Sequence, residues 1–252
     1  MHKKVLVVDD IPINCKILVM HLNKLGIASE TASNGEEAVA LCMRNRYSII
    51  LMDLDMPVMD GFKATKLIRV YEQSLGIRTP IVAVSSFDNS QNRQRCIGEG
   101  LDGLMEKGLN SEELMRVIGS YSMEDTMTRS PALALQRKVR QQLDMDGELA
   151  QLQCNFGPKT AEIVSEFIFM GRSLFEEFES AIANRSSMQL THVAYSIKGS
   201  CSSLGLNAMA HLCAEIADDG YAGRWQQVSR KYRNLLDLFS EVQNATTNKR
   251  VS

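Results

Sequence analysis

The stretch Ile49-Ile50-Leu51-Met52-Asp53 places four apolar residues directly before an aspartate. An apolar run without polar alternation predicts a strand that is covered on both faces, which is typical of a parallel sheet. Val5–Val8 and Ile81–Val84 are two more runs of this kind, and weaker strands are predicted at 28–32 and 103–105. The aspartate is therefore expected at the carboxyl edge of a parallel sheet.

Amphipathic segments with helical spacing separate these strands. They fall at about 12–25, 35–45, 61–74, 89–99 and 111–121. The pair Ser33-Asn34 ahead of Glu36-Glu37 is typical of a helix start, with a capping side chain and acids in the first turn. Five strand–helix units in succession predict a doubly wound α/β domain.

The second half of the chain carries a different pattern. After Tyr121 the segment 122–132 is polar and poorly periodic, and it is predicted to be a linker. Beyond it the apolar residues recur at steps of three and four. The helical patterns cover about 163–181, 190–204, 207–218 and 224–243. We therefore predict an α/β domain at 1–121 and an all-α four-helix bundle at 133–246.

Composition excludes several classes of protein. With 252 residues, 44% hydrophobic and 23% charged, the chain is typical of globular proteins. It contains no apolar stretch of about 18 residues, and its N-terminus is too short for a signal peptide, so no membrane partner is expected. Six scattered cysteines without a Cys-x-x-Cys pair indicate reduced thiols and a cytoplasmic location. The net charge of −2 gives no DNA-binding footprint.

Polar residues follow the predicted strands where the sheet has its carboxyl edge. Asp9-Asp10 follow the first strand, Asp53 ends the third, Ser85 ends the fourth and Lys107 follows the fifth. Converging carboxylates favour a hard cation such as Mg²⁺. A carboxylate can also act as a nucleophile and form an aspartyl phosphate. A lysine and a hydroxyl nearby would then bind the phosphoryl oxygens.

These residues, together with the stretch Met52–Gly61, resemble the response-regulator receiver family, which has a flavodoxin-like (βα)5 fold. The resemblance implies that a sensor histidine kinase or phosphotransfer donor phosphorylates Asp53. It implies Asp9 and Asp10 as Mg²⁺ ligands, directly or through water, with Asp53 and the backbone carbonyl of Asp55 completing the shell. Ser85 would be the switch hydroxyl, and Lys107 would pair with the phosphoryl group.

Two positions depart from the family pattern. Gly108 follows the lysine where the family usually has a proline after a cis peptide bond. In this chain the bond is expected to be trans, or the loop to be looser. Leu104 occupies the position of the family's switch aromatic. The coupling of hydroxyl and aromatic is therefore expected to be weak in this chain.

The segment Ala194–Gly205 resembles the central helix of histidine phosphotransfer (HPt) domains, whose pattern is His-x-x-Lys-Gly. Lys198 and Gly199 match the pattern, but Tyr195 stands where the family has its phosphorylated histidine. A phenol has a pKa near ~10 and lacks the reactivity of an imidazole. We expect that Tyr195 does not relay phosphate.

His192 is the alternative acceptor, three residues earlier on the polar face that it is predicted to share with Tyr195 and Gly199. A surface histidine without phosphotransfer is the leading interpretation, because Lys198 and Gly199 are then out of register. His211 belongs to another helix and is expected to have a packing or surface role. A native histidine at position 195, replaced in this chain, is a further alternative.

The leading hypothesis for the whole chain is a two-component response regulator and phosphoprotein. Its degenerate HPt-like domain would serve phosphorylation-controlled interaction with an effector. The alternative is a phosphorelay intermediate that passes phosphate through a histidine of the HPt domain to a downstream receiver. No recognition helix for DNA is apparent, and no nucleophile–base pair beyond the receiver site suggests an independent enzyme.

Overall fold

The computed structural model describes residues 4–85, 96–108, 111–122, 147–148, 152 and 156–248. The chain divides into two compact units, residues 1–138 and 139–252, and each is described by itself. Within the described ranges the structure contains no helix whose length and apolar character would let it span a membrane. Most of the predicted linker, residues 123–132, lies outside the described residues, so the domain boundaries stay a prediction.

The first unit is built on a five-stranded parallel sheet in the order β2-β1-β3-β4-β5. The strands are β1 (Lys4–Val8), β2 (Ser29–Ala32), β3 (Tyr47–Asp53), β4 (Ile81–Ser85) and β5 (Gly103–Glu106). All five predicted strands are confirmed. In the register, Val8 of β1 pairs with Met52 of β3, and Asp53 pairs with Val84 of β4. The residues that follow Val8, Met52 and Val84 therefore emerge together at the carboxyl edge.

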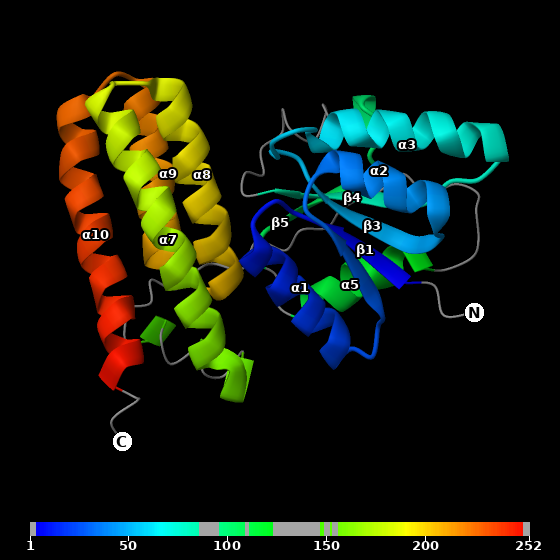
Figure 1. Cartoon of the computed structure of the whole chain (residues 1–252), viewed down its shortest axis with the longest axis horizontal. Helices are drawn as coiled ribbons and strands as arrows, with labels where there is room; N and C mark the ends of the chain where they lie inside the picture. The colour runs from blue at the N-terminus through cyan, green and yellow to red at the C-terminus, as the bar shows by residue number, and fades with distance from the viewer. Residues whose placement is uncertain are drawn as a thin grey trace. The chain divides into compact units, whose positions relative to one another are not determined.

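Helices cover both faces of this sheet, as the doubly wound prediction requires (Figure 1). They are α1 (Pro12–Lys24), α2 (Gly35–Arg44), α3 (Gly61–Leu75) and α5 (Ser111–Ser122). Alternate strand residues pack against α2 and α3 on one face and against α1 and α5 on the other. Of the helix predicted at 89–99, residues 96–98 are helical and 89–95 lie outside the described residues. The sheet is thus buried on both sides, which explains its uninterrupted apolar runs.

Two helix starts near the carboxyl edge are fixed by side-chain caps. The Asn34 side chain accepts a hydrogen bond from the Glu37 amide at 2.9 Å, which confirms the predicted start of α2. Asp60 caps α3 by accepting from the Lys63 amide at 2.8 Å. Gly61 begins α3 so close to β3 that a Cβ there would overlap the carbonyl oxygen of Asp53. A glycine is therefore required where α3 leaves the site.

The second unit is helical, as predicted, and Figure 1 shows its long helices side by side. It contains the 3₁₀ turn η1 (Gly157–Lys159), α7 (Thr160–Ala183), α8 (Ser187–Leu204), α9 (Asn207–Tyr221) and α10 (Trp225–Asn248). Helix α9 continues past its predicted end at 218, although Asp219 lies in its last turn, where a carboxylate opposes the helix dipole. Arg224 and Lys231 offset the charge of this carboxylate, at 2.7 and 2.9 Å.

Aromatic rings join α7 to α10 in the core of the bundle. The ring centroids of Phe175 and Phe239 are 4.6 Å apart, and those of Phe178 and Tyr232 are 5.0 Å apart. The Tyr232 hydroxyl donates to the carbonyl oxygen of Phe175 at 3.3 Å. Offset ring pairs of this kind add to the burial of apolar surface, so these contacts fix the pairing of the two long helices.

Candidate functional site

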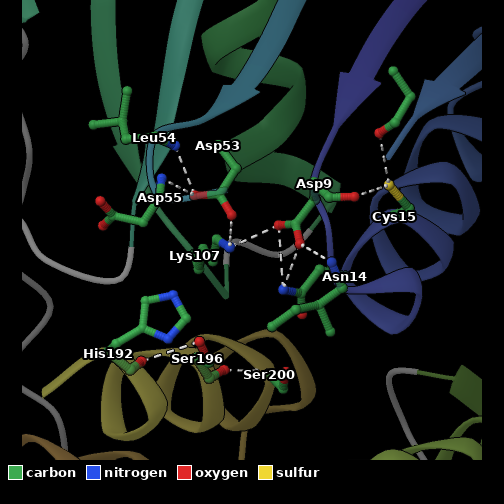
Figure 2. Close-up of polar contacts among 12 residues, drawn as sticks. Asp9, Asn14, Cys15, Asp53, Leu54, Asp55, Lys107, His192, Ser196 and Ser200 are labelled. Atoms are coloured by element: carbon green, nitrogen blue, oxygen red, sulfur yellow. Dashed lines mark hydrogen bonds and ion pairs between the residues drawn. The ribbon is translucent and has the colours of Figure 1, made fainter. Parts of the chain in front are cut away.

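The carboxyl edge of the sheet brings together three charged side chains from distant parts of the sequence. Asp9 follows β1, Asp53 ends β3 and Lys107 follows β5. The Lys107 ammonium Nζ donates to Asp9 Oδ2 at 2.7 Å and to Asp53 Oδ2 at 2.8 Å, as Figure 2 shows. All three residues are buried, so one cation is shared by two carboxylates in a region from which water is largely excluded.

The other Asp53 oxygen is held by the backbone of the loop that follows. Oδ1 accepts hydrogen bonds from the amides of Leu54 at 2.7 Å and Asp55 at 3.5 Å. Burial raises the pKa of Asp53 to about 7; Lys107 opposes this rise and Asp9 adds to it. Burial alone would lower the pKa of Lys107, but the two carboxylates raise it above its ordinary value, so the ammonium stays charged.

Three carboxylates are close enough to share a cation. Oxygen atoms of Asp9, Asp10 and Asp53 all lie within 4.8 Å of one another. Asp10 is half-buried, whereas Asp9 and Asp53 are buried. Hard divalent cations such as Mg²⁺ prefer oxygen ligands, and a cation there would offset the excess of negative charge that Lys107 alone does not balance. The donor set therefore fits Mg²⁺.

The remaining predicted residues of this site lie at the same edge. Ser85 is buried at the end of β4, and its carbonyl oxygen accepts from the Lys107 amide at 2.9 Å. Gly108 has a φ of 94°, in the left-handed region, and the described chain contains no cis peptide bond. Proline, with φ fixed near −65°, cannot adopt this conformation. The peptide bond between Lys107 and Gly108 is thus trans, which is one of the two outcomes expected from Gly108.

Leu104, which the sequence resemblance assigns to the family's aromatic position, belongs to the hydrophobic core. It is 2% exposed, pairs with Ala83 of β4 and belongs to the core cluster on the α2/α3 face of the sheet. An aliphatic side chain held in this way has no hydroxyl or ring with which to contact the Ser85 side of the site. The buried aliphatic side chain at position 104 agrees with the expectation that the Ser85 hydroxyl is only weakly coupled to the protein surface.

The predicted features of the bundle lie along α8. The Tyr195 ring is half-buried, and Lys198 Nζ lies 5.6 Å from its centroid, within reach of a cation–π interaction. Burial, and then the charge of Asp218, raise the pKa of Tyr195, so the phenol stays protonated at neutral pH. His192 is exposed, as expected, whereas Gly199 is buried, although the sequence placed both on one polar face.

Two serine hydroxyls on α8 bond back to the preceding turn of the helix. The Ser196 hydroxyl donates to the carbonyl oxygen of His192 at 3.1 Å, and the Ser200 hydroxyl donates to that of Ser196 at 3.3 Å (Figure 2). His211, on α9, is a surface residue, 3.8 Å from Glu215.

Sequence reasoning missed two residues beside Asp9. Asn14 donates from Nδ2 to both Asp9 oxygens, at 3.0 and 3.2 Å, and the Cys15 thiol donates to the Asp9 carbonyl oxygen at 3.5 Å. Burial raises the pKa of Cys15 to about 12, so it remains a thiol. The available signal was an amide at position 14 on the apolar stripe formed by Ile13 and Ile17.

Family models match both units of the chain. Residues 5–119 match the response regulator receiver domain, and residues 162–245 match the Hpt domain. Both are modules of two-component signal transduction and phosphorelay; they are signalling modules, not classical enzymes. The two matched domains are the ones that the sequence resembles, and the five parallel strands and the helical unit confirm the expected folds.

Curated relatives match the first unit. The E. coli K12 sensor histidine kinase RcsC is 33% identical over 118 residues, which are 47% of this chain and 12% of RcsC. The Vibrio harveyi kinase/phosphatase LuxN is 38% identical over 122 residues, 48% of this chain and 14% of LuxN. The Arabidopsis thaliana two-component response regulator 24 is 38% identical over 114 residues, 45% of this chain and 79% of that relative. The chain thus spans only a small part of the two kinases.

Two solved structures also resemble the first unit. The receiver domain of the Arabidopsis thaliana histidine kinase CKI1 complexed with Mg²⁺ is 38% identical, with a TM-score of 0.44 over 47% of this chain and 90% of that one. The receiver domain of Saccharomyces cerevisiae Ssk1, crystallised with the phosphotransfer protein Ypd1, is 31% identical, with a TM-score of 0.45 over 48% and 91%. Through residues 5–119, which match the family model and a plant response regulator over most of its length, this chain belongs to the response regulator receiver family.

Proposed function

We propose that the chain is a response regulator that accepts a phosphoryl group on Asp53. The observation that carries the proposal is the shared ammonium of Lys107, which lies 2.8 Å from Asp53 and 2.7 Å from Asp9. In this arrangement a fixed positive charge lies where negative charge would build up during phosphoryl transfer. The phosphoryl donor would be a sensor histidine kinase or an HPt protein, and the setting would be the cytoplasm.

The transfer step follows from the chemistry of the carboxylate. An Asp53 carboxylate oxygen would attack the phosphorus atom, forming an O–P bond as the P–N bond to the donor imidazole breaks. The released imidazole then takes up a proton from water. Lys107 would neutralise charge on the phosphoryl oxygens, and the buried Ser85 hydroxyl would donate a hydrogen bond to one of them.

Asp9, Asp10, Asp53 and the backbone carbonyl of Asp55 would hold Mg²⁺ in this proposal. The cation supplies neutralisation of the incoming phosphate and of the clustered carboxylates. The Mg²⁺ of the CKI1 receiver structure belongs to that protein, and the support in this chain is the spacing of three carboxylates within 4.8 Å. Asp55 is exposed, so its side chain is free of the site even though its amide contacts Asp53.

The HPt-like bundle would act in protein interaction and not in phosphate relay. Tyr195 stands at the position of the phosphorylated histidine, and its raised pKa keeps the phenol neutral and a poor nucleophile. Lys198 and Gly199 remain from the family pattern. With Leu104 buried in place of the switch aromatic, phosphorylation of Asp53 would reach the protein's partners by a route other than a turning aromatic ring.

The test is phosphate labelling of the full chain with acetyl phosphate or a phosphorylated donor protein. We expect a base-labile acyl phosphate in the wild type and in Asp237→Asn, which changes an exposed side chain of the other unit. We expect no label in Asp53→Asn. Label that persists in Asp53→Asn would contradict the assignment of the acceptor, and acid-stable label on Tyr195 would contradict the interaction role of the bundle.

A second candidate function is phosphorelay through the bundle, and the exposure of His192 on α8 favours it. Under this alternative His192, or a histidine in place of Tyr195, would carry phosphate to a downstream receiver. The variants Tyr195→His, His192→Gln and His211→Gln separate the outcomes. Base-stable label that is lost in His192→Gln but kept in His211→Gln supports a relay through His192. If only Tyr195→His transfers phosphate to a downstream receiver, position 195 is the family's acceptor position and the site is degenerate in this chain.

A further inference from the structure

Asn14 is a buried amide in contact with the acidic site. It lies in the first turn of α1 and is 1% exposed, between the core residues Ile13 and Ile17. A buried amide is unfavourable unless its polar atoms are hydrogen-bonded. Figure 2 shows Asn14 and Lys107 both bonded to the carboxylate of Asp9. The amide thus occupies a core position and points its donor at a proposed cation ligand.

The surroundings of Asp9 determine which way the Asn14 amide faces. Asp9 accepts from the Ile11 amide at 2.9 Å and from the Lys107 ammonium at 2.7 Å, so its carboxylate acts as an acceptor. The Asn14 nitrogen must therefore be the atom that faces it, because a carbonyl oxygen has no proton to donate. Oδ1 of Asn14 is then directed elsewhere.

That oxygen is buried and finds no hydrogen-bond donor among the described residues. A buried acceptor without a protein partner is usually satisfied by an ordered water. Because the amide nitrogen faces both oxygens of Asp9, this water would lie on the other side of the Asn14 amide group. The need of Asn14 Oδ1 for a hydrogen-bond donor is an observation separate from the clustering of the three carboxylates.

The four hydrogen bonds to Asp9 leave its carboxylate no freedom to rotate. Oδ1 accepts from Ile11 and Asn14, and Oδ2 accepts from Asn14 and Lys107. Because Lys107 bridges Asp9 and Asp53, the orientation of Asp9 also fixes the ammonium against Asp53. A change at Asn14 would therefore be transmitted through Asp9 to Lys107.

We propose that Asn14 is a positioning residue for the cation and phosphoryl site. Its amide nitrogen fixes Asp9, and through Asp9 it fixes Lys107; its carbonyl oxygen, which faces away from Asp9, accepts a hydrogen bond from a buried water. The inference rests on the proposed function of the Asp53 site. Partners that orient metal ligands typically change metal affinity by roughly 10–100-fold when they are removed.

The test is titration of the full, unphosphorylated chain with Mg²⁺ in a calorimeter. Asn14→Leu has a similar volume and removes both polar atoms, and Asn14→Ala guards against a variant that does not fold. Asn23→Leu is the matched control, because Asn23 lies on the same helix and is exposed. We expect both Asn14 variants to bind Mg²⁺ about 10–100-fold more weakly and the control to bind as the wild type does. The Mg²⁺ concentration for half-maximal labelling by acetyl phosphate should rise in parallel.

Melting in EDTA separates positioning from a purely structural role. A folded Asn14→Leu or Asn14→Ala chain with unchanged Mg²⁺ affinity would overturn the inference, even if its melting temperature falls. A wild-type chain that binds no Mg²⁺ would instead overturn the proposed site. The two failures are distinguishable, because the second appears before any substitution is made.

Discussion

Lys107 Nζ lies 2.8 Å from Asp53 Oδ2, although the two residues are 54 positions apart in the sequence. The ammonium is also bonded to Asp9, so two buried carboxylates share one cation. The group of three carries one uncompensated negative charge in a region of low dielectric. The stability of the first unit and its response to pH and Mg²⁺ follow from this imbalance.

Removal of the shared cation should destabilise the first unit strongly. Lys107→Met leaves the buried Asp9 and Asp53 without a counter-charge, which typically costs about 3–5 kcal/mol in the free energy of unfolding. Chemical denaturation in EDTA measures the loss. Lys63→Met, on the exposed side of α3, is the control and should change stability by less than about 0.5 kcal/mol. Equal losses in the two variants would show that the buried pairing is unimportant.

Removal of the Asp53 carboxylate should stabilise the first unit at pH 8. The pKa of Asp53 is raised to about 7, above its ordinary value of 3.8. Between those values the folded state holds a proton that the unfolded state has released, so this group's contribution to stability falls as pH rises from about 4 through about 7. Asp53→Asn should therefore be more stable than the wild type at pH 8 without metal, by roughly 1–3 kcal/mol, with the difference closing near pH 4.

Asp55→Asn is the control for this experiment, because the Asp55 side chain is exposed. Its difference from the wild type should stay small across the same pH range. Mg²⁺ should reduce the advantage of Asp53→Asn at pH 8, since ligand binding stabilises only the chain that keeps the site. An Asp53→Asn chain that is less stable than the wild type at pH 8 in EDTA would contradict the charge imbalance.

His21 should make the first unit sensitive to mild acid. It is buried on α1, with Nδ1 2.7 Å from the Ser111 hydroxyl oxygen, and burial and then Lys24 lower its pKa below 6.5. Below pH 6.5 the unfolded state takes up a proton that the folded state refuses, so stability is lost as pH falls from 6.5 to the folded pKa. Denaturation of His21→Gln should show a flatter pH profile in this window. His211→Gln, an exposed substitution, should keep the wild-type slope.

Two glycine substitutions should act in opposite directions. Gly61→Ala places a Cβ against the carbonyl oxygen of Asp53, so the start of α3 must shift, with a loss of about 1–3 kcal/mol. Gly119→Ala is the matched control in α5, where an added Cβ meets open space and should stabilise the helix by about 0.5–1 kcal/mol. Thermal melts measure both. A neutral Gly61→Ala would show that α3 tolerates displacement from the site.

Glu148 should matter to the bundle as a remote helix cap. Its Oε1 accepts from the Ala208 amide at 2.9 Å, in the first turn of α9, whose own N-cap residue Leu206 makes no side-chain cap bond. Glu148→Ala should destabilise the bundle by about 0.5–2 kcal/mol. Glu148→Gln keeps a carbonyl acceptor of the same length and should lose less. Equal losses would indicate packing and not capping.

The local features of this protein were predictable because they depend on neighbours in the sequence. The strand runs were visible because both faces of the sheet are buried, and Asn34 was recognisable as a cap because its partner, Glu37, is three residues away. The ends of helices were less predictable. Helix α9 continues past its predicted end, and the ammonium of Lys231 on α10 lies 2.9 Å from the Asp219 carboxylate in its last turn, a contact that only the packed bundle brings about.

The sequence by itself determined that Asp9, Asp10, Asp53, Ser85 and Lys107 lie at the ends of strands, because strand order and polarity place all such ends at one edge. Only the tertiary structure decided that Lys107 is shared between Asp9 and Asp53, that Asn14 turns its amide nitrogen to Asp9, and that Glu148 reaches α9. The physical reason is burial. A charged or polar atom removed from water must find its partner in space, and that partner comes from whichever segment the fold brings within hydrogen-bond distance.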